Sequence, residues 1–581
     1  MLYRDLAKVY EKLESTSKQL EKIDILVELF KKTPTDIIDK VIFLTQGKLY
    51  PGWLGLPVVG IAEKSAIKAV SLAIGLKSNI TEEKVREIGD LGSAFEKLHK
   101  KKTQTTLFQS SINVDTVYNR LDKIAQSAGP GSADFKVKNL AGLLGNVDAI
   151  DGKWILRTVL GKLRFGVADA LILDSLTIAF TGDKNNKQII ERGYNIHPNL
   201  GEIAKILASD GLDAFNNMQI EIFIPLRMML AQRSSSIDEI LEKLGGKCAC
   251  EFKYDGERLQ IHRLEDKVIL YTRNLENATP QYPDVCNLIR TLKPVKFIIE
   301  GEVVGINGDT GEMLPFQELM HRRRKYKIEE AIEKNPICLF LFDILKKDMQ
   351  DFLDAPYTVR RRNLQELVEE TDQLKLATAL ISDNAAEIET FFNRSIESGC
   401  EGIIAKSLTS VYESGHREWR WIKLKESYQS KMSDTIDAVV VGAYYGRGRR
   451  ANIYGAFLCG VLDQTEGTYK TICKLGSGFT DADLKFLIQK FEEVKRDKKH
   501  PQVTSEIMSD DWFEPKFIVE ILADEITLSN VHTAGFGEVR PNYGFALRFP
   551  RFIRWREDKS IEDITTTDEI IDMYKRQIKT G

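Results

Sequence analysis

The spacing of hydrophobic residues divides the chain into three stretches. Up to about Gly211, apolar residues recur at helical intervals, as in DLAKVYEKLESTSKQLEKIDILVELFKK and SAIKAVSLAIGL, which predicts amphipathic helices. From about Asn217 to Lys425 the pattern mixes strands and helices; VKFIIEGEVVGING predicts a strand that ends in a turn, and ICLFLFDIL a short buried strand. From Thr435 onward, strand-like runs separated by glycine turns predict a small β-barrel and a short final helix.

Composition narrows the class of protein. A chain of 581 residues with 43% hydrophobic residues is too long for one core. The formal net charge of −3 means that any nucleic-acid surface is a local basic patch. The seven cysteines include no CxxC pair, which argues against a disulfide framework or a four-cysteine zinc site. With no signal-peptide core and no apolar run long enough to cross a bilayer, we expect a soluble intracellular protein.

Glycine turns punctuate the helical stretch at GDLG, AGPGS and LRFGVADA. Each turn alone is explained by helix punctuation. Turns that precede helices also expose backbone N–H groups, which suit phosphate. Several of them together with nearby basic residues indicate a DNA-backbone surface. These basic residues are Lys136, Lys138, Arg157, Lys162 and Arg164.

The run CEFKYDGERLQIHR, Cys250 to Arg263, contains a lysine in a strand-like pattern. Side chains alternate between the faces of a strand, so Glu251, Lys253 and Asp255 share one face. A lysine between two carboxylates is either part of a solvated ion-pair face or a reactive amine held in place. The local pattern alone favours the solvated face.

Two further runs change that balance. In FIIEGEVV, Glu300 and Glu302 share a strand face and form a hard-oxygen pair suited to Mg²⁺. In WIKLK, Trp421, Lys423 and Lys425 share a face, where neighbouring lysines repel each other unless a polyanion lies between them. Together these patterns indicate a site for a metal ion and a phosphate chain.

The motifs KYDGER, TRN, EGEVV, LFDIL, EGIIAK, WIKLK and RFPRFIRWREDK occur in this order. The order resembles that of the ATP-dependent DNA ligases of archaea and eukaryotes, and the resemblance covers nearly the whole chain. It implies a multidomain α+β protein. The expected domains are an all-α DNA-binding domain over residues 1–215, an α+β nucleotidyltransferase (adenylation) domain over 216–425, and an OB-fold β-barrel over 426–581.

The same resemblance implies site roles. Lys253 matches the nucleophile that becomes AMP-bound, Glu251 the acceptor from the adenine amino group, and Phe342 the aromatic residue that stacks on adenine. Glu302 and Glu401 match the acidic residues on the metal and ribose side. The expected ribose and phosphate contacts are Arg258, Arg273, Arg417, Lys423 and Lys425. The expected C-terminal residues that orient pyrophosphate are Arg548 and Arg551, with Arg554, Asp558 and Lys559 in the same motif.

EGIIAK departs from the usual family pattern in its middle residues but retains Glu401 and Lys406. In a straight strand these two would face opposite sides, so Glu401 is expected at a bend, and Lys406 receives no role. Nearby arginines and Mg²⁺ are expected to disfavour the charged form of Lys253 and make it nucleophilic.

The activity implied is that of a DNA ligase (ATP) in replication, repair, recombination and cell division. Lys253 takes AMP from ATP, AMP passes to the 5′-phosphate of a nick, and the 3′-hydroxyl then displaces AMP. The cofactors implied are ATP and Mg²⁺ or Mn²⁺, and the partner is nicked duplex DNA. We expect a cytoplasmic, nucleoid-associated monomer of archaeal type with no membrane association, whose C-terminal barrel rotates on a linker that begins at Glu426.

Two segments suggest additional contacts. KKTQTTLF contains Gln104, Leu107 and Phe108 and resembles a box that binds a sliding clamp (PCNA); a loop with two partly buried apolar residues explains it almost equally well. YYGRGRR, Tyr444 to Arg450, mixes aromatic and basic residues and is expected to contact nucleic acid, with a solvated turn as the alternative.

Other classes share parts of this pattern. An RNA ligase or a messenger-RNA capping enzyme uses the same lysine chemistry but would lack the long helical N-terminal region, and a capping enzyme takes GTP. An NAD-dependent ligase would carry a four-cysteine zinc module. A non-catalytic, clamp-bound DNA scaffold would not need the retained Lys253, Glu302, Lys423, Lys425 and Arg548.

Overall fold

The architecture comes from a computed structural model. It describes residues 1–56, 59–99, 112–307, 313–314, 316–319, 332, 336–425, 435–446, 453–479 and 481–579. Two compact units are present, Met1–Lys423 and Leu424–Gly581, and each is described by itself. The division falls inside one strand, Arg417–Lys425.

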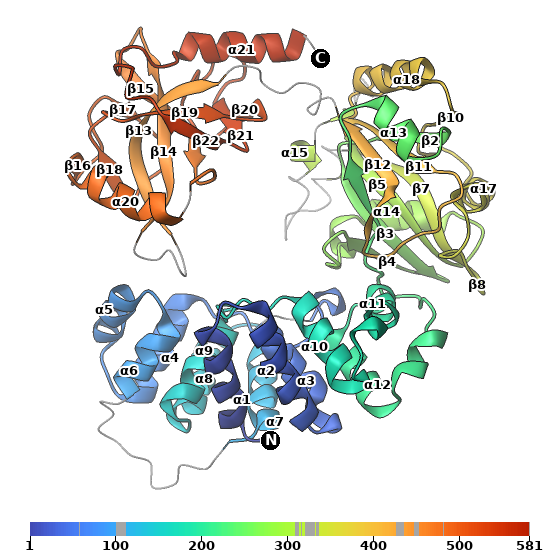
Figure 1. Cartoon of the computed structure of the whole chain (residues 1–581), viewed down its shortest axis with the longest axis horizontal. Coiled ribbons are helices and arrows are strands. Elements are labelled where there is room, and N and C mark those ends of the chain that lie inside the picture. Colours follow the sequence, from blue (N-terminus) through green and yellow to red (C-terminus); the bar gives the residue numbers. More distant parts are fainter. Residues whose placement is uncertain are drawn as a thin grey trace. The chain divides into compact units, whose positions relative to one another are not determined.

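The first unit begins with helices only, coloured blue to teal in Figure 1. Their apolar faces form one core that extends from Tyr3 to Phe215, as the helical spacing of the sequence predicts. Tyr10, Trp154 and Phe165 pack ring against ring within it, with centroids 5.1–5.6 Å apart. The helices are α1 Tyr3–Ser15, α2 Gln19–Lys32, α3 Ile38–Gln46, α4 Glu63–Ile74, α5 Ser78–Ile88, α6 Leu91–His99, α7 Val114–Gln126, α8 Ser132–Gly145, α9 Ala149–Val159, α10 Asp169–Thr181, α11 Lys187–Ile196 and α12 Leu200–Ser209.

One glycine shows how closely these helices approach. A Cβ at Gly152, on α9, would lie 2.0 Å from a ring carbon of Phe95 on α6. Only a residue without a side chain lets the two helices meet at this point. The small residue therefore fixes the packing of α6 against α9.

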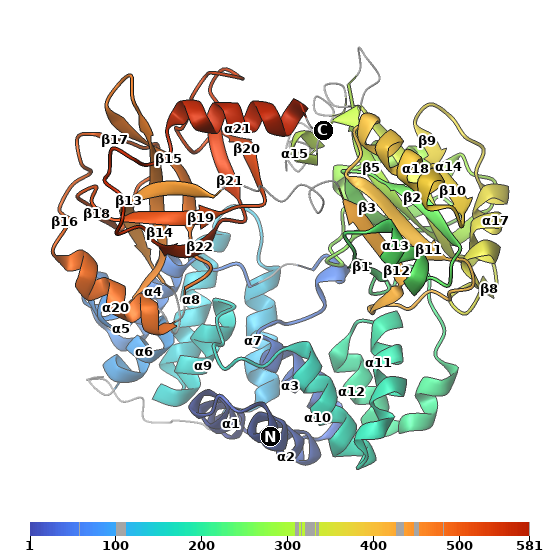
Figure 2. The same ribbon diagram turned by 45° about the horizontal axis from the view of Figure 1, so that its top comes forward.

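The rest of the first unit is built on two sheets (Figure 2). The first has the order β1-β12-β11-β2-β10, where β2 pairs antiparallel with both β11 and β10. The second has the order β4-β3-β5-β7-β8, with β6 on β5 and β9 on β7. The strands are β1 Leu230–Arg233, β2 Cys248–Lys253, β3 Glu257–Leu264, β4 Lys267–Thr272, β5 Lys296–Ile306, β6 Met313–Leu314, β7 Ile337–Lys347, β8 Gln350–Asp351, β9 Leu374–Leu376, β10 Ala379–Ser382, β11 Gly402–Ser407 and β12 Arg417–Lys425.

Helices cover these sheets: α18 lies against β2, β10 and β11, and α17 against β7. The helices are α13 Ile237–Lys243, α14 Pro283–Arg290, α15 Phe316–Leu319, α17 Tyr357–Leu367 and α18 Ala385–Glu397. The alternation predicted for β5 is confirmed, because Phe297, Ile299 and Val303 enter one hydrophobic core and Ile298 enters a different core with Trp421. One face of β5 is thereby turned toward the β12 residues of the other sheet.

The second unit is a curled sheet around a core that includes Phe457, Phe491 and Phe513. The predicted fold class of helical, mixed and β-barrel parts is confirmed. The strands of the second unit are β13 Ile436–Tyr445, β14 Tyr454–Asp463, β15 Thr468–Leu475, β16 Lys495–Arg496, β17 Val503–Thr504, β18 Asp511–Phe513, β19 Ile518–Leu522, β20 Glu525–Ser529, β21 Gly544–Arg548 and β22 Arg551–Trp555. Its helices are α20 Asp481–Glu492 and α21 Thr567–Lys579.

Two further features concern the cysteines and the membrane. All seven cysteines are buried free thiols. In the part of the chain that the structure describes, no helix combines the length and the apolar composition needed to cross a bilayer.

Candidate active site

Lys253 ends strand β2, and its amine pairs with the carboxylate of Glu401. Glu401 lies directly before β11, whose first residue, Gly402, has a φ of +140°. This backbone conformation strongly favours glycine, and it turns the chain between Glu401 and the strand. The predicted bend is therefore present, and it brings Glu401 to the face of β2 that carries the lysine.

Glu302 on β5 is the second acid near this amine. Burial, together with the charges of Glu401 and Asp255, raises the pKa of Glu302 to about 7, although Lys253 and Arg258 act in the opposite direction. Asp255 accepts a hydrogen bond from the backbone N–H of Phe316 at 3.1 Å. Three carboxylates thus influence one another around one lysine.

The part of the expectation about the amine that rests on nearby arginines is wrong. Burial alone would lower the pKa of Lys253, but the charges of Glu401, Glu302 and Asp255 outweigh it and raise that pKa above its ordinary value. Carboxylates, and not the predicted arginines, are the charged groups that shift this pKa most. Lys253 is held in its charged form until the surrounding charge changes.

The two carboxylates predicted from FIIEGEVV, Glu300 and Glu302, have different surroundings. Glu300 is fully buried and accepts hydrogen bonds from Arg258 at 2.8 Å, Tyr412 at 3.0 Å and Gln260 at 3.1 Å. Its oxygens are therefore committed to protein partners, which corrects the interpretation of Glu300 as a metal ligand. Glu302 is the member of the pair on which the charge of Glu401 acts.

The donor set near Lys253 fits a magnesium ion. In the described residues no group of three or more His, Cys, Asp or Glu side chains is arranged as a metal site. Mg²⁺, however, is usually held by one or two carboxylates together with substrate phosphates. Burial, and then the negative charges of Glu401 and Asp255, raise the pKa of Glu302, and such an ion would neutralise that negative charge.

Arg258 on β3 contacts side chains of both sheets. Besides Glu300 it donates to the carbonyl oxygen of Met229 at 2.8 Å. Its guanidinium carbon lies 5.3 Å from the ring centroid of Phe342 and 5.4 Å from that of Trp421. The structure therefore brings Arg258 and Phe342, both predicted site residues, into one cluster.

Glu251 is buried two residues before Lys253 and has partners on both oxygens. Tyr357 donates its hydroxyl to Oε1 at 2.6 Å, and the Lys406 amine lies 2.6 Å from Oε2. Arg361 approaches Oε1 at 3.6 Å. Glu251 is thus a fixed carboxylate on the same strand face as Lys253.

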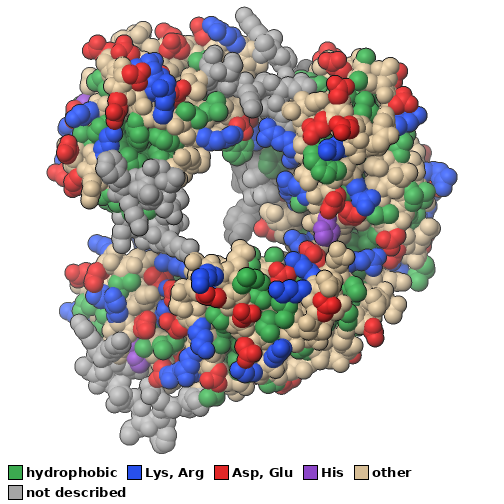
Figure 3. Space-filling model, in the orientation of Figure 1, with side chains coloured by type: hydrophobic (Ala, Val, Ile, Leu, Met, Phe, Trp, Pro, Cys, Tyr) green, Lys and Arg blue, Asp and Glu red, His purple; other side chains and the backbone are tan. Residues whose placement is uncertain are grey.

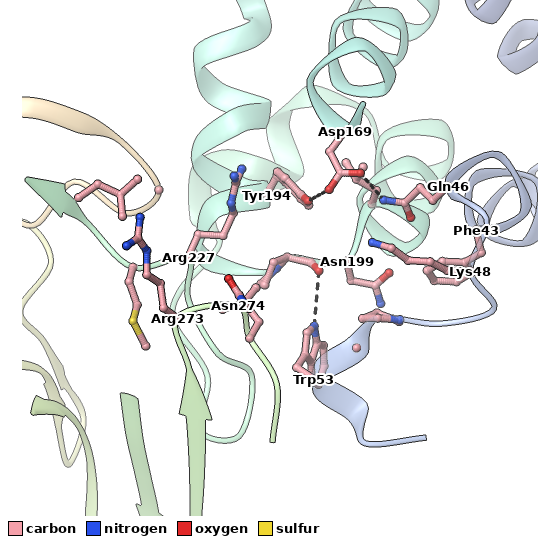
Figure 4. A pocket seen from close by; sticks show the side chains of 18 residues that line it. Phe43, Gln46, Lys48, Trp53, Asp169, Tyr194, Asn199, Arg227, Arg273 and Asn274 are labelled. Atoms are coloured by element: carbon pink, nitrogen blue, oxygen red, sulfur yellow. Dashed lines mark hydrogen bonds between the residues drawn. The ribbon is translucent and has the colours of Figure 1, made fainter. Parts of the chain in front are cut away.

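Arg273 and Arg417 are exposed and belong to one positive region. Burial lowers the pKa of Arg273, the charges of Arg258 and Arg417 lower it further, and Glu302 opposes them. Arg273 also lines a cavity of about 300 Å³ (Figure 4). There Asp169 accepts hydrogen bonds from Gln46 at 2.7 Å and Tyr194 at 2.8 Å.

Lys423 and Lys425 follow Trp421 on β12 and are partly buried. Trp421 is buried against Phe342 and Tyr412, with ring centroids 6.4 Å and 5.9 Å away. Strand alternation turns Lys423 and Lys425 toward the face that Trp421 occupies. The parity predicted for WIKLK thus agrees with the burial of Trp421 in this cluster.

The C-terminal motif residues lie in the second unit and form local ion pairs. Arg548 pairs with Glu525, and Arg551 pairs with Asp524; both arginine side chains are half exposed. Arg554 contacts Glu520 at 2.6 Å, and Lys559 contacts Asp437 at 2.6 Å. Asp558 accepts from Arg556 at 2.8 Å.

The predicted basic surface of the helical region needs one correction. Arg157 is buried and pairs with Glu14 at 2.8 Å and Asp90 at 2.9 Å, so it holds helices together and is not a DNA contact. Lys138 is exposed on α8, whose first residue follows the exposed Gly131. On the face shown in Figure 3, Lys and Arg side chains are interspersed with Asp and Glu.

Several predictions fall outside the described residues. They are the clamp box Gln104–Phe108, the linker that begins at Glu426, and the arginines of YYGRGRR. Sequence reasoning also missed residues that complete the site: Tyr357, Arg361, Lys406 and Tyr412. Lys406 could have been found from the register, since it shares a strand face with Ile404, which pairs with Glu251.

Comparison with known proteins gives an independent view of the whole chain. It matches the family models "DNA ligase N terminus" over residues 2–177, "ATP dependent DNA ligase domain" over 228–425 and "ATP dependent DNA ligase C terminal region" over 450–559. It is 45% identical to the DNA ligase of Sulfophobococcus zilligii, covering 100% of this chain and 98% of that protein. It is 44% identical to the DNA ligase of Saccharolobus solfataricus, with the same coverage.

Among solved structures, the chain resembles one titled "Pmar-Lig_PreS3" with a TM-score of 0.54 and 18% identity, covering 95% of this chain and 99% of that one. This likeness supports the fold. The full-length identity to curated ligases supports the enzyme class, and the alternatives of a capping enzyme, an RNA ligase and a non-catalytic scaffold are set aside. The chain belongs to the ATP-dependent DNA ligases, enzymes that bind DNA and use ATP to seal nicks in the duplex.

Proposed function

We propose that this ligase carries its activated AMP on Lys253 and that the surrounding residues act in the roles expected from the sequence. The observation that supports this most strongly is the pairing of the Lys253 amine with Glu401, beside Glu302. Glu251 lies on the same strand as this amine, and Arg258 contacts Phe342 on β7 with its guanidinium carbon 5.3 Å from the ring centroid. The site therefore contains an amine whose pKa depends on nearby charges, together with side chains suited to contact a base, a ribose and phosphates.

In the first step the Lys253 amine, after losing a proton, attacks the α-phosphorus of ATP. A P–N bond forms, and the bond to pyrophosphate breaks. Arg273, Arg417, Lys423 and Lys425 supply positive charge for the phosphate oxygens. Glu251 accepts a hydrogen bond from the adenine amino group, and Phe342 stacks on the base.

Glu302 and Glu401 would hold a divalent cation, Mg²⁺ or Mn²⁺. When bound, the cation supplies positive charge that neutralises these carboxylates and the phosphate oxygens. With their charge offset in this way, the two acids would favour the charged form of the Lys253 amine less strongly. Glu401, as the direct partner of the amine, is the group best positioned to take its proton, after which Glu302 and the phosphate oxygens would hold the cation.

In the later steps an oxygen of the 5′-phosphate at the nick attacks the AMP phosphorus, and the P–N bond breaks. The 3′-hydroxyl then attacks the 5′-phosphorus, a phosphodiester forms and AMP leaves. We assign DNA binding to residues 1–215, nucleotidyl transfer to 216–425 and the OB-fold to 426–581. Arg548 and Arg551 of the OB-fold orient the departing pyrophosphate.

The proposal is tested by incubating the protein with α-labelled ATP and Mg²⁺ and mapping the labelled peptide. We expect the label on Lys253, and we expect Lys253→Ala to bind nicked DNA without sealing it. Lys247→Ala is the matched control, because Lys247 is half exposed and lies 3.9 Å from Asp383. Label on another residue, or sealing by Lys253→Ala, would contradict the proposal.

We further propose that the enzyme is a monomer of the cytoplasm and nucleoid and that Gln104–Phe108 binds a sliding clamp. The support is the sequence of that segment, a glutamine followed by Leu107 and Phe108. Replacing Leu107 and Phe108 by alanine should abolish co-elution with a clamp and leave sealing of a short nicked duplex unchanged. Unchanged co-elution would refute clamp binding through this segment.

A further inference from the structure

Lys406 is a buried cation that the mechanism above does not use. Its side chain is 1% exposed, and its amine lies 2.6 Å from Glu251 Oε2. Three rings surround the amine, with centroids 4.3 Å away for Trp421, 4.9 Å for Phe342 and 5.2 Å for Tyr357. The amine also lies 3.4 Å from the carbonyl oxygen of Phe342.

This arrangement resembles an aromatic cage closed by one carboxylate. Rings attract a cation through their negatively charged faces, and the attraction is stronger where water is excluded. Burial lowers the pKa of Lys406, whereas the charges of Glu251 and Asp343 act in the opposite direction. Asp343 is itself paired with Arg360 at 2.7 Å, so Glu251 is the direct counter-ion of Lys406.

The state of Glu251 decides which bases it can accept. An ionised carboxylate only accepts hydrogen bonds, whereas a protonated one also donates. Adenine carries a donating amino group at position 6, and guanine carries an accepting carbonyl oxygen there. A carboxylate kept ionised by a buried cation therefore favours adenine and repels guanine.

We propose that Lys406 is a positioning residue that keeps Glu251 an acceptor-only carboxylate in one orientation and thereby selects ATP over nucleotides with a 6-carbonyl group. The inference rests on the proposed placement of the base at Glu251. Tyr357 supports the same carboxylate from the other side through its hydroxyl. Loss of Lys406 would remove the direct counter-ion that holds Glu251 Oε2, and with it the fixed acceptor for a 6-amino group.

The test measures kcat/KM for formation of the lysyl nucleotide from ATP, GTP and inosine triphosphate, using the full chain. Inosine triphosphate carries the carbonyl oxygen without the 2-amino group of guanine. We expect Lys406→Met and Lys406→Gln to lower kcat/KM for ATP by about 10- to 100-fold and to lower it much less for the other two. The ATP preference should then shrink by a similar factor.

Two variants refine the result. Lys406→Arg keeps the charge and should restore most of the ATP preference, while Tyr357→Phe should lower that preference several-fold with little change in packing. Lys346→Met is the matched control, because Lys346 is also a buried lysine in an ion pair, with Asp351 on β8. It should change all three kcat/KM values by one common factor.

An unchanged ATP preference in Lys406→Gln and Tyr357→Phe would overturn the proposal, even if all rates fell. If Lys406→Met failed to fold, as judged by thermal unfolding, Lys406→Gln and Tyr357→Phe would decide. Failure of the proposed function is distinguishable, because the label from wild-type protein would then not map to Lys253. Label on Lys253 with an unaltered preference refutes only the role of Lys406.

Discussion

Lys253 and Glu401 meet twice, through the main chain and through their side chains. The Glu401 N–H donates to the carbonyl oxygen of Lys253 at 2.9 Å, and the Glu401 carboxylate pairs with the Lys253 amine. The main-chain bond fixes Glu401 beside the lysine before any ligand arrives. These contacts therefore favour the charged form of the amine, and the proposed attack on ATP requires the nearby acids to be neutralised.

Replacing Glu401 by glutamine should lower the pKa of Lys253. The negative charge of Glu401 raises that pKa against the effect of burial, so its removal lets burial dominate. In nucleotide-free protein near pH 8, acetylation of Lys253 by an activated ester should accelerate by roughly tenfold for each unit by which the pKa falls. Mass spectrometry gives the rate relative to Lys247 in the same molecule. An unchanged ratio would show that Glu401 does not control the amine.

The affinity for Mg²⁺ during formation of lysyl-AMP should weaken as the pH falls below 7. The pKa of Glu302 is about 7, raised mainly by burial, and a protonated carboxyl group does not bind a cation. The apparent Mg²⁺ constant should rise by up to about tenfold per pH unit, as measured from initial rates at pH 6, 7 and 8. Glu302→Gln should bind Mg²⁺ more weakly and show a flat profile; a flat wild-type profile would contradict the assignment.

The same pKa predicts an effect on stability. Glu302 binds its proton more tightly in the folded state, because its pKa is raised from about 4.3 in the unfolded chain to about 7. The resulting stabilisation is fully present below pH 4.3 and is lost as the pH rises through 7. In metal-free protein, Glu302→Gln should therefore melt above the wild type at pH 8, with a smaller difference at pH 5. A melting temperature of Glu302→Gln below that of the wild type at pH 8 would refute the raised pKa of Glu302.

Arg157→Gln and Lys138→Ala should separate folding from DNA binding. Arg157 is buried with Glu14 and Asp90, and removing one partner of a buried ion pair costs about 3–5 kcal/mol of unfolding free energy. Lys138 is exposed, so its removal should weaken DNA binding and reduce the salt slope by about one. Chemical denaturation and salt-dependent binding to nicked duplex measure the two effects. The opposite pattern would restore Arg157 as a DNA contact.

Gly415→Ala should destabilise the first unit. Gly415 has a φ of +75°, and a Cβ there would lie 2.5 Å from Asn195 Oδ1. Positive φ alone costs on the order of 1–2 kcal/mol for a residue with a side chain, and the contact adds to it. Gly182→Ala is the matched control, with a φ of +73° and open space around it. Equal losses of unfolding free energy in the two variants would show that Asn195 yields.

The sequence predicted those parts of the site that follow from strand alternation. Phe297 and Ile298 enter different cores, and Trp421 is buried among the site residues, as the period of two requires. Strand alternation alone could not separate Glu300 from Glu302, because both lie on one face of β5. The difference arises from Arg258 and Tyr412, which lie outside β5 and donate hydrogen bonds to the buried Glu300.

Other misses have the same physical origin. The raised pKa of Lys253 depends on the bend at Gly402 that brings Glu401 close. Arg157 is buried because α9 packs against the parts of the chain that carry Glu14 and Asp90. Lys406 resembled an ordinary lysine at the end of a strand. Its cage is assembled from Trp421, Phe342 and Tyr357 on three separate elements, and no local pattern reports such a meeting.

The burial of all seven cysteines has a practical consequence. Maleimides react with accessible thiolates, so the folded wild-type chain should incorporate almost no dye. Cysteines introduced at exposed positions, such as Lys138 and Met508, would then be labelled selectively without first removing the native thiols. A donor and an acceptor fluorophore at these positions would follow the separation of the two units in single molecules through each stage of ligation.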